Sequence, residues 1–393
     1  MMFAVLSVIR KPFTRLFVVF AAFWLAACQP VSMTNTGGAR TTSGAPIAVA
    51  LLVPHGSASP QEQQLARDLE NAARLAVSDL AGVKIDLRVY GTAGQPVQAQ
   101  SAALNAVADG ARIIVGPLHA ESANAVAVAV ANKNVNVLAF SNNPTIAGGN
   151  LFILGQTFQT TANRLASFAT RQGKSRIMAV YSNNLAGQLG RAAIEQAVRD
   201  NGATLAGSIG YEFSQQGVVS AIPAIRTAAE TNAADAIFMT ANTAGALPLF
   251  SQMLPESGLG PDRMQYIGLA RWDTPRQTLD LPGVQGGWFA LPDPQRTAQF
   301  NSRFQAANGN TPHPIAGLAY DGIAAVGALV KSNKREALGR NALTQSAGFQ
   351  GVNGVFRLRA DGSNERGLAV ATIRNKQVVI LSPAPQSFGG AGF

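Results

Sequence analysis

The chain has 393 residues, of which 47% are hydrophobic and 13% are charged, and its formal net charge is +10. This composition excludes a disordered protein, and the length exceeds what one hydrophobic core usually supports, so two domains or lobes are expected. The basic residues form no run interleaved with aromatics, which argues against a nucleic-acid partner, and three histidines with one cysteine, Cys28, leave no zinc site, disulfide or cofactor to expect.

The amino terminus has the pattern of a secretory signal. Basic residues precede an apolar run, residues 16–24, which is shorter than the roughly 20 residues that a membrane-spanning helix needs. Leu-Ala-Ala-Cys follows at residues 25–28 and resembles the lipobox of bacterial lipoproteins. The resemblance implies a signal peptide over residues 1–27 and lipid attachment to the thiol of Cys28.

Residues 28–45 are rich in Ser, Thr, Gly and Pro and show no apolar periodicity, which is typical of a flexible tether. Gln29, rather than Asp, follows the cysteine. By resemblance to enterobacterial lipoproteins, this implies sorting to the outer membrane. We therefore expect a periplasmic protein that is anchored through its amino-terminal lipid in the inner leaflet of the outer membrane.

The first predicted lobe alternates strands and helices. Residues 46–54 are a continuous apolar strand of the kind that is buried on both faces of a parallel sheet. Ser59, Pro60 and Glu62 then form a capping-box pattern that starts a helix. The elements that follow are strand 83–90, helix 96–109, strand 112–115, helix 121–133 and strand 135–140.

The second predicted lobe repeats this alternation after a crossing strand at residues 151–157. Its elements are helix 160–171, strand 176–181, helix 185–200, strand 203–209, helix 217–230, strand 235–239, helix 243–254 and strand 265–268. A second crossing strand is predicted at 286–293, mainly helical structure at 294–345 and three short strands at 351–383. The predicted boundaries are lobe 1, residues 46–158 plus 290–345; lobe 2, residues 159–289 plus 346–385; and a flexible tail, residues 386–393.

Six stretches carry a family resemblance: residues 46–54, 113–130, 137–143, 179–198, 313–326 and 349–375. Together they resemble type I periplasmic binding proteins of the leucine/isoleucine/valine-binding group. With the lipobox, the chain looks most like the penicillin-binding protein activator lipoproteins of the LppC family, whose carboxyl-terminal domain has this fold. The resemblance implies a two-lobed α/β fold in which each lobe is a parallel-sheet sandwich, with crossover strands between the lobes and a ligand cleft.

Candidate cleft residues follow the predicted strands, because ligands of open α/β sheets bind beyond the carboxyl ends of the strands. A free amino acid would need N–H and hydroxyl donors for its carboxylate, and an acid with an aromatic face for its ammonium. By position, the candidates are His55, Ser57, Ser122, Ser141 and Asn142 in the first lobe and Tyr181, Asn183, Trp272 and Asp273 in the second. The last two occupy the loop where the amino-acid binders resembled place an ammonium-binding acid.

An alternative role for several of these residues is purely structural. Ser122 and Ser141 would then cap helices, Asn142 and Asn183 would form turns, and Tyr320 with Asp321 would begin and cap a packed helix. His119 would be a loop or cleft-wall residue.

Two functions fit the sequence. The first is a lipid-anchored activator of a peptidoglycan synthase, a class A penicillin-binding protein, and the alternative is the substrate-binding lipoprotein of an ABC transporter for branched-chain or other amino acids or amides. An outer-membrane anchor would keep a receptor away from an inner-membrane permease and favours the activator. No G-x-S-x-G, H-E-x-x-H, C-x-x-C or Rossmann glycine motif occurs, so catalytic residues and enzymatic activity are not expected.

Overall fold

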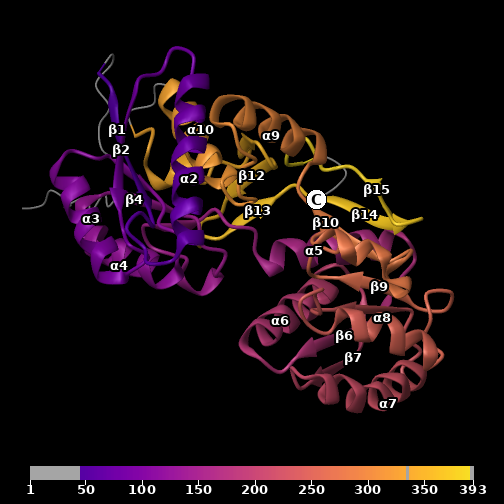
Figure 1. The fold of residues 1–393 in the computed structure, drawn as a ribbon. Helices are drawn as coiled ribbons and strands as arrows, with labels where there is room; N and C mark the ends of the chain where they lie inside the picture. The colour runs from indigo at the N-terminus through magenta and orange to yellow at the C-terminus, as the bar shows by residue number, and fades with distance from the viewer. Residues whose placement is uncertain (1–44, 333–335, 390–393) are drawn as a thin grey trace, which may run out of the picture. The chain divides into compact units, whose positions relative to one another are not determined.

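The computed structural model describes residues 45–332 and 336–389 (Figure 1). The predicted signal peptide, the lipidation site Cys28 and the tether up to residue 44 lie outside the described residues. Across the part that is described, no helix has both the length and the apolarity that a membrane span requires. Strands and helices alternate through most of the chain and build two large sheets, which confirms the predicted two-lobed α/β class.

The first lobe is built on a five-stranded parallel sheet in the order β2-β1-β3-β4-β5. Its strands are β1 (Ile47–Val53), β2 (Ile85–Gly91), β3 (Ile113–Val115), β4 (Asn136–Ala139) and β5 (Leu151–Ile153). Strands β1, β3 and β4 are buried along nearly their whole length. Because these strands are buried on both faces, their sequences are continuous apolar runs rather than an alternation of apolar and polar residues.

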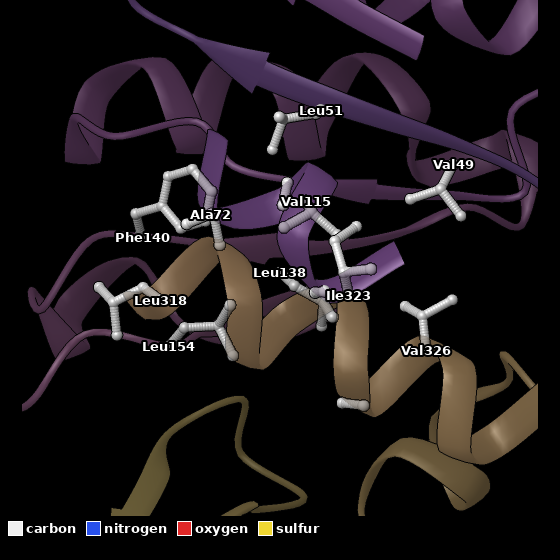
Figure 2. Packing of buried hydrophobic residues seen from close by; sticks show 14 of the residues in the cluster. Val49, Leu51, Ala72, Val115, Leu138, Phe140, Leu154, Leu318, Ile323 and Val326 are labelled. Carbon is white, nitrogen blue, oxygen red and sulfur yellow. The ribbon is translucent and has the colours of Figure 1, made fainter. Parts of the chain in front are cut away.

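Helices cover both faces of this sheet. They are α2 (Pro60–Asp79), α3 (Pro96–Ala108), α4 (Ala120–Val130), α9 (Pro294–Asn308), α10 (Gly317–Lys331) and the short α11 (Arg340–Leu343), with single 3-10 turns η1 (Ala131–Lys133) and η2 (Pro144–Ile146). Figure 2 shows the face on which Val49 and Leu51 of β1 pack with Ala72 of α2 and with Ile323 and Val326 of α10. The alternate residues of β1 form the other face, which packs against α3 and α4.

The second lobe is built on a seven-stranded sheet in the order β15-β14-β10-β9-β8-β6-β7. Strands β6 (Arg176–Ser182), β7 (Thr204–Tyr211), β8 (Ala236–Met239), β9 (Gln265–Gly268) and β10 (Trp288–Leu291) are parallel. Two antiparallel strands, β14 (Ala369–Arg374) and β15 (Gln377–Ser382), extend it.

The helices of the second lobe pack on the two faces of this sheet in pairs. Helices α5 (Phe158–Arg171) and α6 (Leu185–Asp200) share one apolar cluster, and α7 (Gln215–Thr231) and α8 (Leu247–Glu256) share the other. Two short 3-10 helices, η3 (Arg276–Asp280) and η4 (Pro282–Val284), lie between β9 and β10.

The predicted carboxyl-terminal boundaries need correction. A small antiparallel sheet of β11 (Phe349–Gly351), β12 (Gly354–Leu358) and β13 (Asn364–Arg366) stands where the prediction assigned the chain to lobe 2. Phe349, Phe356 and Leu358 of this sheet pack in the first-lobe core, because their apolar side chains face that cluster. Residues 349–382 thus form five strands rather than three, and β10 belongs wholly to the second-lobe sheet.

The predicted flexible tail is also corrected for the residues that are described. The side-chain amide of Gln386 donates to the carboxylate of Asp293 at 3.1 Å. The ring of Phe388 lies under the guanidinium of Arg357, 4.4 Å from its Cζ to the ring centroid. Gln386 and Phe388 therefore contact the fold.

A buried ion pair joins α10 to β13. Asp321 is fully buried, and its carboxylate accepts from Nη1 of Arg366 at 2.9 Å and from the backbone N–H of Val352 at 2.8 Å. The same guanidinium donates from Nε and Nη2 to the carbonyl of Leu154, at 2.9 and 2.6 Å. Burial raises the pKa of Asp321, and Arg366 acts in the opposite direction. From its position within α10, Asp321 therefore binds both Val352 and Arg366. It does not cap the helix, whose N-cap is Ala316.

Candidate ligand-binding site

A pocket of about 570 Å³ lies at the carboxyl edge of the first-lobe sheet. The segments that line it follow three neighbouring strands: residues 118–120 after β3, residues 140–143 after β4 and residues 155–156 after β5. The carboxyl ends of parallel strands meet at one edge of a sheet, so these segments converge although they are separated in sequence. The other lining residues are Arg271, Pro292, Pro314, Ile315, Leu318, Asn353, Arg366 and Leu368.

His119 enters the pocket wall from the loop between β3 and α4. Its Nε2 lies 3.0 Å from Oε1 of Glu62, and the other carboxylate oxygen of Glu62 accepts from the hydroxyl of Ser57 at 2.7 Å. The backbone N–H of Glu62 donates to Ser59 at 3.3 Å, as the predicted N-cap requires. The Glu62 side chain completes no capping box and instead holds His119 at the pocket.

Ser141 and Asn142 lie where the sequence predicted them, in the turn after β4 that lines the pocket. The hydroxyl of Ser141 accepts from the backbone N–H of Asn143 at 3.1 Å, which orders the turn. A hydroxyl that accepts one hydrogen bond still has its own hydrogen to donate. Ser141 therefore orders the turn and keeps a hydroxyl hydrogen that is available to donate at the pocket.

Arg271 reaches the pocket from the loop after β9. Its Nε and Nη2 donate to the two carboxylate oxygens of Asp273, at 2.9 and 2.5 Å. This bidentate pair fixes the plane of the guanidinium and leaves Nη1 to donate elsewhere. Asp273, expected to bind an ammonium, is instead the residue that positions Arg271.

Three first-lobe candidates do not line the pocket. His55 pairs with Glu70 at 2.8 Å, and Ser57 is buried beside Glu62. Ser122 is buried inside α4, where its hydroxyl has no hydrogen-bond partner within the described structure. Ser122 does not cap α4 either, because His119 is the N-cap of that helix and Ser122 lies within its first turn.

A smaller pocket of about 160 Å³ lies at the carboxyl edge of the second-lobe sheet. Its lining residues are Phe158, Ser182, Asn184, Ala186, Gly187, Tyr211, Phe213, Thr240, Ala241, Asn242, Leu269 and Ala270. The candidates Tyr181 and Asn183 flank Ser182 but are not part of this lining. Arg191 lies over the Tyr181 ring at 5.1 Å, and Asn183 donates to Glu212 at 2.7 Å.

Trp272 is corrected from a ligand contact to a core residue. Its side chain is 0% exposed and packs against Phe289 with a centroid distance of 6.5 Å. A β-carbon at Gly268 would lie 2.3 Å from the indole, and one at Gly287 would lie 2.4 Å from it. Two glycines thus make room for the ring in the interior of the second lobe.

Sequence reasoning missed Gln156, Arg271, Asn353 and Arg366 as pocket residues. For Arg271 a signal was available, because it precedes the predicted pair Trp272 and Asp273 directly. Arg366 carried no such signal, since it lies in a hairpin that the prediction assigned to the other lobe.

Two α/β lobes with pockets at the carboxyl edges of their sheets are the architecture of two-lobed binding proteins. The chain belongs to the periplasmic binding protein family, whose model matches residues 46–377. Membership of this family implies a periplasmic location. No curated protein sequence matches the chain.

Several solved structures share the fold. A protein from Rhodospirillum rubrum, assigned to branched-chain amino acid ABC transport, is 18% identical with a TM-score of 0.72, over 86% of this chain and 100% of that one. A substrate-binding protein from Desulfitobacterium hafniense in complex with Leu is 18% identical with a TM-score of 0.61, over 86% and 100%. A solute-binding protein from Rhodopseudomonas palustris in complex with benzoate is 17% identical with a TM-score of 0.56, over 88% and 99%. Identities this low establish the fold alone.

Proposed function

We propose that this protein is the substrate-binding component of an ABC transporter, a lipid-anchored periplasmic receptor that captures a small organic ligand and delivers it to a permease. The observation that carries the proposal is the pocket of about 570 Å³ at the carboxyl edge of the first-lobe sheet. This volume suits a small molecule, and the lining combines apolar walls with a few polar groups, as ligand sites do. Ser141, Asn142, His119 and Arg271 are the proposed polar contacts.

This proposal takes precedence over the activator function that the sequence favoured. The similar structures are named as components of ABC transporters, and two of them hold small ligands, leucine and benzoate. A protein that acted only through surface contact would have no need of a formed pocket. Attachment through Cys28 remains part of the proposal and concerns residues before those described. Delivery to a permease requires this anchor to lie in the inner membrane rather than in the outer membrane that Gln29 implied.

A thermal-shift screen of the purified protein against amino acids, amides and organic acids tests the proposal. A ligand that binds the pocket should stabilise the folded state by about 2.7 kcal/mol at about one hundred times its Kd. Ser141→Ala should reduce this stabilisation, whereas Ser122→Ala, a buried serine outside the pocket lining, should retain it. A screen in which no compound shifts the melting temperature would refute the receptor proposal. Stimulation of a purified class A penicillin-binding protein would then support the activator.

A further inference from the structure

Every ionisable side chain that lines the larger pocket, within the described part of the chain, is a base. These side chains are His119, Arg271 and Arg366. The described residues that line the smaller pocket carry no formal charge. Tyr211 is the one titratable group among them. The linings of these two pockets therefore contain cationic and neutral groups, whereas a separate pocket of about 590 Å³, which shares Arg366, also has Asp200, Asp361 and Glu365 in its lining.

Four acids beside these linings already have hydrogen-bond partners. Glu62 holds His119 and Ser57, and Asp273 holds Arg271 through two hydrogen bonds. Asp321 is buried against Arg366, and Glu212, which lies between two residues of the smaller pocket, accepts from Asn183. Each acid positions a neighbouring side chain, so recruiting one to an ammonium would break an existing interaction.

This arrangement favours an anion over a zwitterion. A carboxylate can accept from Nη1 of Arg271 and from the hydroxyl of Ser141, in charge-assisted and neutral hydrogen bonds respectively. An ammonium group on the same ligand would lose hydration in a pocket whose lining has no acid side chain to serve as its counter-ion, which is costly. From the geometry we infer that the ligand is an organic monocarboxylate without an ammonium group, an inference that rests on the proposed receptor function.

The body of that ligand is apolar. Phe140, Ile315, Leu318 and Leu368 contribute to the walls of the larger pocket. The loop after β9 continues into the smaller pocket through Leu269 and Ala270, where the side chains of Phe158 and Phe213 are 37% and 59% exposed. Exposed aromatic rings beside a pocket are suited to cover an aliphatic or aromatic group. The ligand class is therefore a carboxylate on a hydrocarbon chain or ring.

Matched ligand sets test this inference by calorimetry and thermal shift on the purified protein. One set is leucine, isocaproate and isopentylamine, and the other is phenylalanine, hydrocinnamate and phenethylamine. Each set compares the amino acid with the same skeleton lacking the ammonium or the carboxylate. The carboxylate without ammonium should bind at least about tenfold more tightly than its amino acid in one or both sets.

Two arginine variants locate the effect. Arg271→Gln should weaken carboxylate binding by about tenfold or more. Arg276→Gln, an exposed arginine of η3 outside both linings, should leave it unchanged. The melting temperature without ligand shows whether each variant is folded. If Arg271→Gln fails to fold, Ser141→Ala, which removes the second proposed donor, should weaken carboxylate binding instead.

The outcomes separate the inference from the proposed function. If a compound binds but neither set shows this preference for the carboxylate over its amino acid, the monocarboxylate inference is overturned and the receptor function stands. Equal loss in Arg271→Gln and Arg276→Gln would also overturn it. Binding of no compound in these sets or in the wider screen would remove both.

Discussion

Replacing Arg366 with methionine should lower the free energy of unfolding by about 3–5 kcal/mol. The side chains of Arg366 and Asp321 are 5% and 0% exposed, so the substitution leaves a carboxylate inside the protein without its cation. It also removes the two donors to the carbonyl of Leu154. Urea denaturation at neutral pH measures the loss as a lower midpoint with an unchanged slope.

The exposed pair of Lys376 and Asp280 is the control. These side chains are 66% and 64% exposed at 3.2 Å, so Lys376→Met should change stability by no more than about 1 kcal/mol. Asp321→Asn combined with Arg366→Met should cost less than the sum of the two single changes. A loss in Arg366→Met no greater than that of the control would contradict the role of the buried pair.

The loss of stability in Arg366→Met should depend on pH. Burial already raises the pKa of Asp321 above its ordinary 3.8, and removal of Arg366 takes away the cation that opposes this shift. A carboxyl whose folded-state pKa is raised favours folding in its protonated form, and stability falls as pH rises through that pKa. The free energy of unfolding of Arg366→Met should therefore be closer to that of the unchanged protein at mildly acidic pH than at pH 8. A deficit that grows towards acidic pH would contradict this assignment.

Replacing Trp272 with alanine should lower the free energy of unfolding by about 3–5 kcal/mol. The ring is fully buried beside Phe289, so its loss removes a large apolar surface and leaves a cavity. Gly268→Ala should also destabilise, by about 1–3 kcal/mol, because the new methyl group would overlap the indole. Denaturation of the ligand-free protein measures both effects.

Phe213→Ala is the control for loss of an aromatic ring. Phe213 is exposed, so this change should alter stability by no more than about 0.5 kcal/mol. If Trp272→Ala kept its stability but lost ligand binding, Trp272 would return to the site as the sequence predicted.

The amino-acid sequence by itself determined the class of fold and placed two of the candidate residues, Ser141 and Asn142, in the pocket lining. Strand β1 is a continuous apolar run because it is buried on both faces of a parallel sheet, and that pattern can be read without a structure. Ser141 and Asn142 were predictable because they follow such a strand, and the carboxyl ends of parallel strands share an edge. Hydrophobic periodicity and the succession of strands and helices along the chain are local properties of the sequence.

Tertiary packing decided the rest of the site. In the loop after β9, the sequence pattern does not show whether Trp272 or Arg271 faces the pocket. Gly268 and Gly287 leave space for the indole in the core, so Trp272 is buried and Arg271 lines the pocket. Arg366 lines the pocket because Asp321, 45 residues away in sequence, holds it there. The sheet of β11, β12 and β13 joins the first lobe because its phenylalanines pack in that core. Such choices depend on contacts between distant segments, which the spacing of residues along the chain does not encode.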